Sequence, residues 1–283
     1  MQLFLGIDGG GTRCRAAVSD ASGCVLGTGS AGPANIATDI ENARVNILDA
    51  TMQALQGVVG PSAADVLPHL HAALGLAGAN VPTCAARLST TLPFASIQIK
   101  SDAVIAAKGA LHNDDGIVAA LGTGSVFAVQ RAGKLSQNGG WGFVLGDEGG
   151  GAWLGRALLS RSLRAVDGVE PMTPLLQSTL NDLGASSGVL SFGLTGRPAD
   201  FAAFAPQIAA SNDVAARAIM LQAETDITAM IDHLQGSAPV PVTFIGGLGQ
   251  IFAARLADRW PQRIAYGSGL DGALWFARRG IPA

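Results

Sequence analysis

Apolar residues along this chain follow two kinds of spacing, one typical of helices and one typical of strands. Residues 42–55 carry apolar side chains three to four positions apart, which predicts an amphipathic helix. The short apolar runs at 70–77 and 94–99 predict buried strands, and residues 104–111 predict a second helix. This alternation favours an α/β fold.

The second half of the chain shows more helical spacing. Residues 152–235 are predicted to be mostly helical, with breaks at 168–174 and 184–198 where glycines and prolines occur. Residues 242–245 predict a strand that leads through several glycines into a helix reaching Trp260. The alternating α/β pattern therefore continues to the end of the chain.

One glycine-containing pattern occurs twice. The stretch Asp-Gly-Gly-Gly-Thr at 8–12 and the stretch Gly-Thr-Gly-Ser at 122–125 each follow an apolar run and precede another. Each copy predicts a strand, a Gly-Thr loop, a strand, a turn and a strand. Glycine lets backbone N–H groups approach an anion closely. Two such loops indicate a nucleotide polyphosphate held between two similar lobes, although glycine-rich hairpin turns without a ligand would have the same pattern.

Two common nucleotide motifs do not fit these glycines. A Rossmann fingerprint requires a third glycine where Cys14 stands, and its loop opens a helix, whereas residues 13–20 predict a strand. A Walker A loop requires a lysine after its last glycine, and no such stretch occurs in the chain. The predicted phosphate loop therefore lies on a hairpin.

Composition narrows the classes of function. The 283 residues are 48% hydrophobic and 14% charged, which is typical of a globular enzyme. The formal net charge of −3 and the scarcity of lysine argue against a nucleic-acid partner. The apolar runs are too short to span a membrane, and the first residues do not resemble a signal peptide. We expect a cytoplasmic protein with a small-molecule substrate.

The three cysteines do not form a recognisable metal motif. Cys14, Cys24 and Cys84 lack C-x-x-C spacing and have no histidine cluster nearby, which argues against zinc and iron–sulfur sites. Cys14 and Cys24 are expected to point into the sheet as small apolar residues.

The order of the motifs resembles a known superfamily. The stretches at 8–12, 122–125 and 245–249 are similar to the two phosphate motifs and the adenosine motif of actin-like ATPases, which include sugar kinases and Hsp70-type proteins. Within it, the chain resembles the branch of N-acetylglucosamine kinases, bacterial glucosamine kinases and BadF/BcrA-type ATPases. Gly-Trp-Gly at 140–142 and Gly-Asp-Glu-Gly at 146–149 are its most specific marks.

This resemblance implies a two-lobed, ribonuclease H-like α/β fold. Each lobe would contain a mixed five-stranded sheet with flanking helices, and a cleft would separate the lobes. We expect an N-terminal lobe at residues 1–112, completed by the terminal helix 270–283, and a C-terminal lobe at 113–269. Asp271 is expected to be the N-cap of that terminal helix.

The resemblance also implies an activity, the transfer of the ATP γ-phosphate to the 6-hydroxyl of glucosamine or N-acetylglucosamine. Asp8 would hold Mg²⁺ through water, because Mg²⁺ keeps much of its hydration shell; a turn-forming aspartate before glycine is the structural alternative. The residues implied to bind the nucleotide are Gly10, Gly11, Thr12, Gly122, Thr123, Gly124, Gly246 and Gly247.

Asp102 is the candidate general base. It follows a predicted strand and opens a predicted helix, so its residue type alone favours a helix cap. The resemblance instead implies that it accepts the proton of the sugar 6-hydroxyl.

Sugar recognition is implied for Asn35, Gly140, Trp141 and Asp147, since amides and carboxylates at fixed positions read pyranose hydroxyls well. Trp141 could instead be a core residue. The choice between glucosamine and N-acetylglucosamine stays open, and a homodimer rests on the relatives alone.

Two other functions fit the sequence less well. BadF/BcrA-type relatives bind an iron–sulfur cluster through cysteines of the second lobe, but all three cysteines here precede residue 85. An actin-like protein without sugar kinase activity would leave the Gly-Trp-Gly stretch unexplained.

Overall fold

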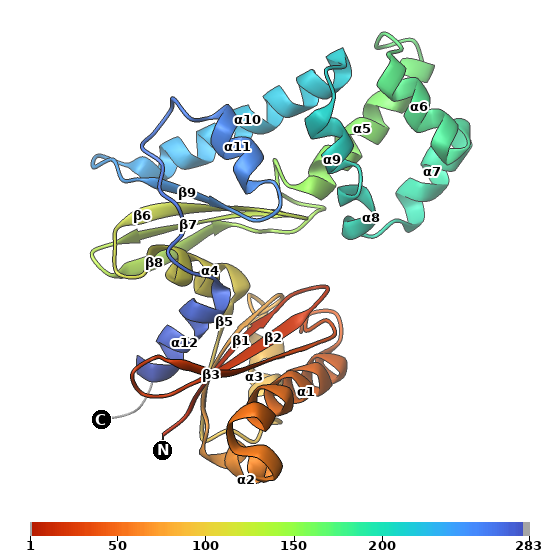
Figure 1. The fold of residues 1–283 in the computed structure, drawn as a ribbon. Helices are drawn as coiled ribbons and strands as arrows, with labels where there is room; N and C mark the ends of the chain where they lie inside the picture. The colour runs from red at the N-terminus through yellow and green to blue at the C-terminus, as the bar shows by residue number, and fades with distance from the viewer. Residues whose placement is uncertain (1, 280–283) are drawn as a thin grey trace. The chain divides into compact units, whose positions relative to one another are not determined.

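The computed structural model describes residues 2–279, which form two compact units (Figure 1). The first unit contains the described residues up to Asp115, the segment Gln130–Ser136 and the described residues from Ile264 onward. The second unit contains Gly116–Val129 and Gln137–Arg263. Residues 280–283 of the predicted terminal helix lie outside the described residues.

The first unit is built on a mixed five-stranded sheet in the order β3-β2-β1-β4-β5. Strands β1, β2 and β3 form an antiparallel meander, and β4 and β5 run parallel to β1. In chain order the strands are β1 (Phe4–Gly9), β2 (Cys14–Ser19), β3 (Val25–Ala31), β4 (His71–Leu76) and β5 (Ser96–Ser101). The predicted strand, Gly-Thr loop, strand, turn and strand are confirmed.

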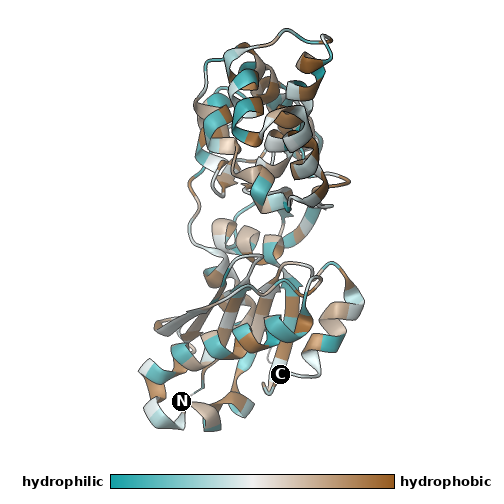
Figure 2. Ribbon diagram, turned by 90° about the vertical axis from the view of Figure 1, so that its right-hand side faces the viewer, coloured by the Kyte–Doolittle hydropathy of each residue, from teal (hydrophilic) through white to brown (hydrophobic). Residues whose placement is uncertain are grey.

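Helices cover both faces of this sheet. Leu5 and Ile7 of β1 point into an apolar core shared with α1, whereas Gly6, on the opposite face, lies against Leu274 of α12. The helices of this unit are α1 (Ile40–Val59), α2 (Ala63–Val66), α3 (Pro82–Ser89), α4 (Asp102–Leu111) and α12 (Gly269–Arg279), with short 3₁₀ turns at Gly60–Ser62 and Leu67–His69. Hydrophobic and hydrophilic residues alternate along the helices, as amphipathic packing requires (Figure 2).

The C-terminal helix α12 crosses α4 at unusually short range. A Cβ placed on Gly272 would overlap the carbonyl oxygen of Ile105, and a Cβ on Gly109 would overlap that of Ser268. Asp271 is not the N-cap that we predicted, because it lies inside the first turn of α12. Its Oδ2 accepts hydrogen bonds from the backbone N–H (2.6 Å) and the hydroxyl (2.7 Å) of Ser268.

The second unit contains a four-stranded sheet in the order β8-β7-β6-β9, with β6 and β9 parallel. Its strands are β6 (Gly116–Leu121), β7 (Ser125–Arg131), β8 (Lys134–Gly139) and β9 (Val242–Ile245). The predicted fifth strand is wrong. Within the described residues, pairing beyond β9 is limited to one parallel bridge between Val242 and Gln262.

Seven helices of this unit follow the two meanders in the described part of the chain. They are α5 (Gly151–Val166), α6 (Pro174–Leu183), α7 (Ala185–Thr195), α8 (Pro198–Ala202), α9 (Ala205–Ala210), α10 (Val214–Gln235) and α11 (Gly249–Arg255). The buried faces of α5, α6, α9, α10 and α11 form one large apolar cluster with β6 and β9. Helices α7 and α8 contribute Val189 and Phe201 to a smaller cluster beside it. No helix among residues 2–279 has both the length and the apolar character needed to cross a membrane.

Two predicted features of the helical region are wrong. The predicted break after Gly184 contains helix α7, because Val189 is buried and Phe192 packs edge-on against Phe201, which outweighs the low helix propensity of its glycines and serines. Helix α11 ends at Arg255 and does not reach Trp260. The side chain of Gln262 donates hydrogen bonds to the carbonyls of Ala253 (2.9 Å) and Leu256 (3.2 Å), which completes the end of that helix.

The turn between β7 and β8 belongs to the first unit, although the sequence placed it in the C-terminal lobe. The buried Gln130 donates hydrogen bonds from Nε2 to the carbonyls of His112 (3.1 Å) and Asp114 (2.7 Å). Its Oε1 accepts a hydrogen bond from the buried Lys108 (3.1 Å), whose ammonium lies 3.9 Å from the ring centre of Trp275. The predicted lobes themselves stay a prediction.

The cysteines differ in burial. Cys14 is buried as predicted, and desolvation, with the nearby Asp8 carboxylate, raises the pKa of its thiol to about 12. Cys24 is exposed in the β2–β3 turn, so the prediction that it points into the sheet is wrong.

The close crossing of α12 and α4 can be tested by adding one methyl group. We expect Gly272→Ala to lower the free energy of unfolding by about 1–3 kcal/mol, because backbone atoms of α4 must move. Urea denaturation would measure the change. Gly57→Ala is the control, since Gly57 is exposed in α1 with no atom within 4 Å of the added Cβ, and it should be neutral or stabilising by up to about 1 kcal/mol. Equal stability of the two variants would contradict the packing argument.

Candidate functional site

The first glycine loop, between β1 and β2, is held firmly on one side and open on the other. The N–H of Gly10 donates to the carbonyl of Arg13 (2.9 Å), which closes the turn, and the carbonyls of Gly9 and Gly10 accept from Ala77 (2.8 Å) and Ala34 (2.9 Å). A Cβ on Gly11 would meet no atom within 4 Å. Gly11 and Thr12 are exposed, so the outer side of the loop is accessible to a ligand.

Asp8 lies half-buried on β1 immediately before this loop. It is paired in register with Arg15 on β2, and their side chains form an ion pair. A Cβ on Gly269 would lie 2.9 Å from Asp8 Oδ2, so the N-terminus of α12 approaches the carboxylate closely. The positive end of a helix stabilises a carboxylate in this place.

Asp102 is the first residue of α4, but it is not the cap of that helix. The hydroxyl of Ser101 accepts the N–H of Val104 (3.3 Å), so Ser101 is the N-cap. Asp102 is accessible to solvent, and its Oδ1 accepts the N–H of Ala103 (2.9 Å). Protein atoms that crowd the carboxyl raise its pKa above the ordinary aspartate value, and the negative charge of Asp8 raises it further.

Asp8 and Asp102 therefore share one edge of the sheet. Strands β1, β4 and β5 are parallel; Asp8 is the last residue but one of β1, and Asp102 directly follows β5, so both lie at the carboxyl ends of these strands. Two carboxylates beside an open loop fit Mg²⁺, which usually takes one or two carboxylates and keeps several waters. Within residues 2–279 no cluster of three or more His, Cys, Asp or Glu side chains could hold a metal ion.

Asn35 lies at the same end of the sheet. Its Oδ1 accepts the N–H of Ala37 (3.0 Å), and the N–H of Ile36 donates to the carbonyl of Ala77 just beyond β4 (3.0 Å). Gly78 has a φ of +84°, and a Cβ there would lie 2.8 Å from Asn35 Oδ1. The glycine allows the Asn35 segment to pack against the end of β4.

In the second unit, the loop from Gly122 to Gly124 rests on the start of α5. The carbonyls of Gly122 and Thr123 accept the N–H groups of Gly151 and Ala152, each at 2.8 Å. The N–H of Gly122 donates to the carbonyl of Gly124 (2.9 Å). Thr123 is exposed, so its side chain remains accessible.

Asp147 joins this loop to the Gly-Trp-Gly stretch. Its Oδ1 accepts the N–H of Gly142 (3.1 Å), and a Cβ on Gly124 would overlap its Oδ2. Asp147 itself has a φ of +63°, a left-handed conformation that aspartate tolerates better than most residues. Its carbonyl accepts the N–H of Gly150 (2.9 Å). The loop at 122–124 and the Gly-Trp-Gly stretch at 140–142, which are separate in the sequence, are thus joined in the structure by Asp147.

Trp141 is not a core residue, because its exposed fraction is 73%. Val144 and Leu145 nearby are exposed by 80% and 82%. The backbone of Phe143 is fixed by Arg156, whose side chain donates a hydrogen bond to the Phe143 carbonyl (3.0 Å). Gly140 has a φ of +70°. The loop therefore presents an apolar outer surface on a fixed base.

The third motif lies beside the second. Gly246 has a φ of +89°, and a Cβ there would overlap the carbonyl oxygen of Leu121, which also accepts the N–H of Leu248 (2.9 Å). Gly247 is exposed with open space around it. Because Leu121 directly precedes the Gly122 loop, both motifs lie at the carboxyl ends of the parallel strands β6 and β9.

The structure thus groups the predicted site residues by unit. The first unit gathers one set at one edge of its sheet, namely Asp8, Gly10, Gly11, Thr12, Asn35 and Asp102. The second unit gathers Gly122, Thr123, Gly124, Gly140, Trp141, Asp147, Gly246 and Gly247.

Sequence reasoning missed three residues that shape the first set. Arg15 forms an ion pair with Asp8, and Ser101 is the N-cap of α4. Gly269 has no side chain, which allows the start of α12 to lie close to Asp8. The hairpin itself carried a signal for Arg15, because the two strands flanking a short loop place Asp8 and Arg15 opposite each other.

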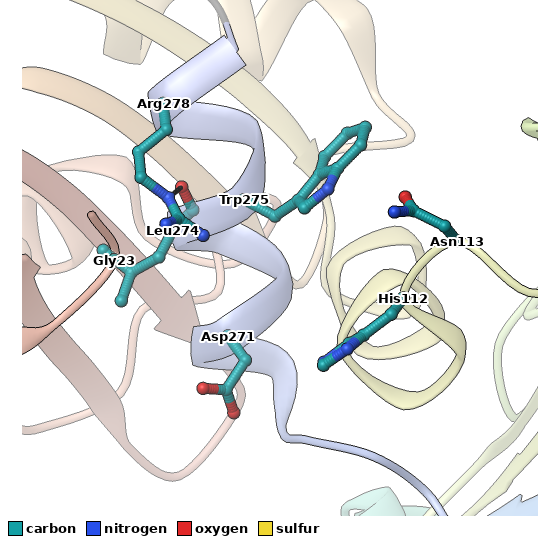
Figure 3. Close-up of a pocket in the computed structure, with 7 residues that line it drawn as sticks. All are labelled: Gly23, His112, Asn113, Asp271, Leu274, Trp275 and Arg278. Atoms are coloured by element: carbon teal, nitrogen blue, oxygen red, sulfur yellow. Dashed lines mark hydrogen bonds between the residues drawn. The ribbon is translucent and has the colours of Figure 1, made fainter. Parts of the chain in front are cut away.

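A cavity of about 200 Å³ in the first unit lies apart from these residues (Figure 3). Its walls come from the β2–β3 turn, the end of α4 and helix α12, and its lining residues are Gly23, His112, Asn113, Asp271, Leu274, Trp275 and Arg278. None of the predicted site residues lines it.

Comparison with known proteins finds relatives along most of the chain. The model of the BadF/BadG/BcrA/BcrD ATPase family matches residues 5–257. A glucosamine kinase from Vibrio cholerae is 33% identical over 98% of this chain and 96% of its own length. An N-acetylmuramic acid/N-acetylglucosamine kinase from Clostridium acetobutylicum is 27% identical, over 59% of this chain and 55% of that protein.

A solved structure extends the similarity to the whole fold. A candidate N-acetylglucosamine kinase from Chromobacterium violaceum superposes with a TM-score of 0.88 at 28% identity, over 98% of this chain and 99% of that one. The predicted α/β fold class is therefore confirmed, with sheets of five and four strands. The chain belongs to the BadF/BadG/BcrA/BcrD ATPase family.

Proposed function

We propose that this protein is an amino-sugar kinase, which transfers the γ-phosphate of ATP to the 6-hydroxyl of glucosamine or N-acetylglucosamine. The observation that carries the proposal is the position of Asp147, between the Gly-Trp-Gly stretch and the loop at Gly124. A carboxylate in that place can bind a sugar hydroxyl beside a phosphate-binding loop. The relative from Vibrio cholerae, matched over nearly its whole length, supports the same chemistry.

Phosphoryl transfer needs mainly in-line placement, neutralised charge and a proton acceptor. Asp102 is the proposed acceptor of the hydroxyl proton. Ser101, not Asp102, is the N-cap of α4, and the raised pKa of Asp102 makes it a stronger base than an ordinary aspartate. Asp8, with Asp102 near it, is the proposed holder of Mg²⁺. When bound, Mg²⁺ neutralises charge on the phosphates.

The remaining residues are proposed to bind and orient the substrates. In the loop of Gly10, Gly11 and Thr12, the N–H of Gly10 closes the turn, and the N–H groups of Gly11 and Thr12 with the Thr12 hydroxyl would bind the terminal phosphate. In the loop at 122–124, the N–H of Gly122 likewise closes the turn, and the groups of Thr123 and Gly124 would bind the neighbouring phosphate. The open space around Gly247 suits a nucleoside lying against the backbone. The Nδ2 group of Asn35 and the segment at Gly140 and Trp141 would contact the sugar. The homodimer stays a prediction.

Sugar dependence is the primary test of this function. We expect ATP turnover in a coupled assay to require glucosamine or N-acetylglucosamine, with little turnover on glucose or without sugar. The comparison of the two amino sugars would also decide the substrate. Equal turnover with and without sugar would instead favour an ATPase role like that of the BadF/BcrA-type relatives.

Removal of the proposed base should act on the chemical step. We expect Asp102→Asn to lower kcat by about 10²- to 10⁴-fold, with a much smaller change in the KM for sugar. The amide keeps an oxygen that can accept the N–H of Ala103, so folding should persist. Asp65→Asn, at an exposed position in α2, is the control and should match wild type. Full activity of Asp102→Asn would rule out Asp102 as the general base.

The pH profile gives a separate check. The base must be deprotonated to accept a proton, so kcat/KM should fall as the pH drops through the pKa of Asp102. Because that pKa is raised, the acid limb should lie above the ordinary aspartate value. The profile of wild type should show this limb, and the residual activity of Asp102→Asn should lack it. An identical limb in both proteins would assign the titration to another group.

A further inference from the structure

The cavity of the first unit has an acidic and a basic end. One wall is a stripe of helix α12 that contains Asp271, Leu274, Trp275 and Arg278. Its volume of about 200 Å³ is below the range usual for drug-sized ligands, so it suits a small metabolite. Asp271 and Arg278 are seven residues apart, about 10 Å along the helix axis, and the apolar side chains lie between them.

Arg278 at the basic end is held in place without an acidic partner. It is half-buried, and it forms no ion pair in the part of the chain that the structure describes. Its Nε donates a hydrogen bond to the carbonyl of Leu274 (3.3 Å), and a Cβ on Gly23 would overlap its Nη1. The guanidinium therefore lies against the β2–β3 turn, and most of its five N–H donors remain for another acceptor.

Further positive charge surrounds Trp275. The ammonium of Lys108 lies 3.9 Å from the ring centre, and the guanidinium of Arg279 lies 4.5 Å from it. Burial, and next the charge of Arg279, lower the pKa of Lys108 below its usual value. The indole N–H of Trp275 donates no hydrogen bond within residues 2–279. An excess of cations beside free donors favours an anion, and the planar fork of Arg278 matches phosphate oxygens.

The acidic end has a free acceptor. The Oδ2 of Asp271 accepts two hydrogen bonds from Ser268, whereas its Oδ1 accepts none from the described residues. His112 and Asn113, at the end of α4, face α12 from the opposite wall (Figure 3). The carbonyl of His112 accepts a hydrogen bond from Gln130 (3.1 Å), which fixes that wall. A carboxylate with a free oxygen suits an ammonium or hydroxyl group of a ligand.

The dipole of α12 explains only part of this arrangement. An acid in the first turn and an arginine in the last turn stabilise a helix, and Asp271 and Arg278 meet that description. The dipole does not require a cavity between the two charges. Nor does it require a free indole N–H at Trp275, or a wall from α4 opposite the helix.

We propose that this cavity is a second binding site, for a small molecule with a phosphate at one end and an ammonium group at the other, as in glucosamine 6-phosphate. The phosphate would bind Arg278 and the Trp275 N–H, the ammonium would bind Asp271, and the sugar ring would lie over Leu274. The choice of ligand rests on the proposed function, because an amino sugar 6-phosphate is its product. The protein would thus bind its product away from the residues proposed to form it.

Fluorine NMR of protein labelled with 5-fluorotryptophan can observe the two sites separately. The chain has four tryptophans, of which Trp275 lines the cavity and Trp141 belongs to the candidate functional site. The variants Trp275→Phe and Trp141→Phe would assign their resonances. We expect glucosamine 6-phosphate to shift the Trp275 resonance saturably, inorganic phosphate to do so with lower affinity, and glucosamine to leave it unchanged.

Substitutions at the two ends should have different effects on these ligands. We expect Arg278→Gln to weaken binding of both glucosamine 6-phosphate and inorganic phosphate at Trp275 by about 10- to 100-fold, the usual loss for a charge-assisted hydrogen bond. Arg278→Lys should lie between wild type and Arg278→Gln, because it keeps the charge and loses the fork. Asp271→Asn should weaken glucosamine 6-phosphate over the same range and leave inorganic phosphate unchanged. Its amide oxygen can still accept from Ser268.

Arg279→Gln is the matched control. It removes a positive charge from the neighbouring position of the same helix, and Arg279 does not line the cavity. It should weaken either ligand much less than Arg278→Gln. Equal losses in the two variants would show a general effect of charge and overturn the contact between Arg278 and phosphate.

The remaining outcomes separate this inference from the proposed function. A Trp275 resonance that glucosamine 6-phosphate does not shift would overturn the second site, even if wild type phosphorylates amino sugars. Unchanged affinity of Asp271→Asn for glucosamine 6-phosphate would overturn the contact with the ammonium group. Wild type that phosphorylates no amino sugar would overturn the kinase proposal, while the Trp275 resonance would still decide whether the cavity binds this ligand.

Discussion

The first unit depends on the close approach of helix α12 to β1 and α4. Gly6, Gly109 and Gly272 remove the side chains that would keep these backbones apart, so the end of the chain packs against its beginning. The same approach brings Gly269, at the helix start, to the carboxylate of Asp8. A single packing arrangement therefore both stabilises the sheet and sets the electrostatic environment of the residue proposed to hold Mg²⁺. The fold and the candidate site both depend on the crossing of α12 and α4, so a substitution at that crossing should change the surroundings of Asp8.

Much of the fold could be predicted from the sequence. Strand-forming apolar runs and the two glycine loops predicted both meanders, because alternation and turn residues act locally. The helix α7 was missed because its residues have low intrinsic helix propensity, and only contacts such as Phe192 with Phe201 make it helical. The prediction of a fifth strand in the second sheet was wrong, because whether a segment joins a sheet depends on non-local pairing. At Val242 and Gln262 that pairing stops after one bridge.

The site shows the same division between local and non-local information. The motifs indicate Asp8 and Asp102 as candidate site residues, but residue type alone favours a capping role for Asp102. The structure assigns the cap to Ser101, one position earlier, by a hydrogen bond that the sequence permits but does not specify. The packing of Asp147 against Gly124 depends on a left-handed aspartate more than twenty residues along the chain, which no local pattern encodes. Roles that follow from contact geometry therefore had to come from the structure.

The two glycine loops have one backbone plan and different surroundings. In the first unit, Gly9 and Gly10 are held by segments that follow β3 and β4, and the carboxylate of Asp8 lies at the loop entrance. In the second, Gly122 and Thr123 are held by the N-terminus of α5, whose positive end lies behind the loop. The first loop thus has the carboxylates of Asp8 and Asp102 at the same edge of its sheet, whereas the second has a helix N-terminus behind it and the carboxylate of Asp147 against Gly124. If both hairpins bind phosphate as we propose, the elements packed behind each copy decide which further chemistry it can perform.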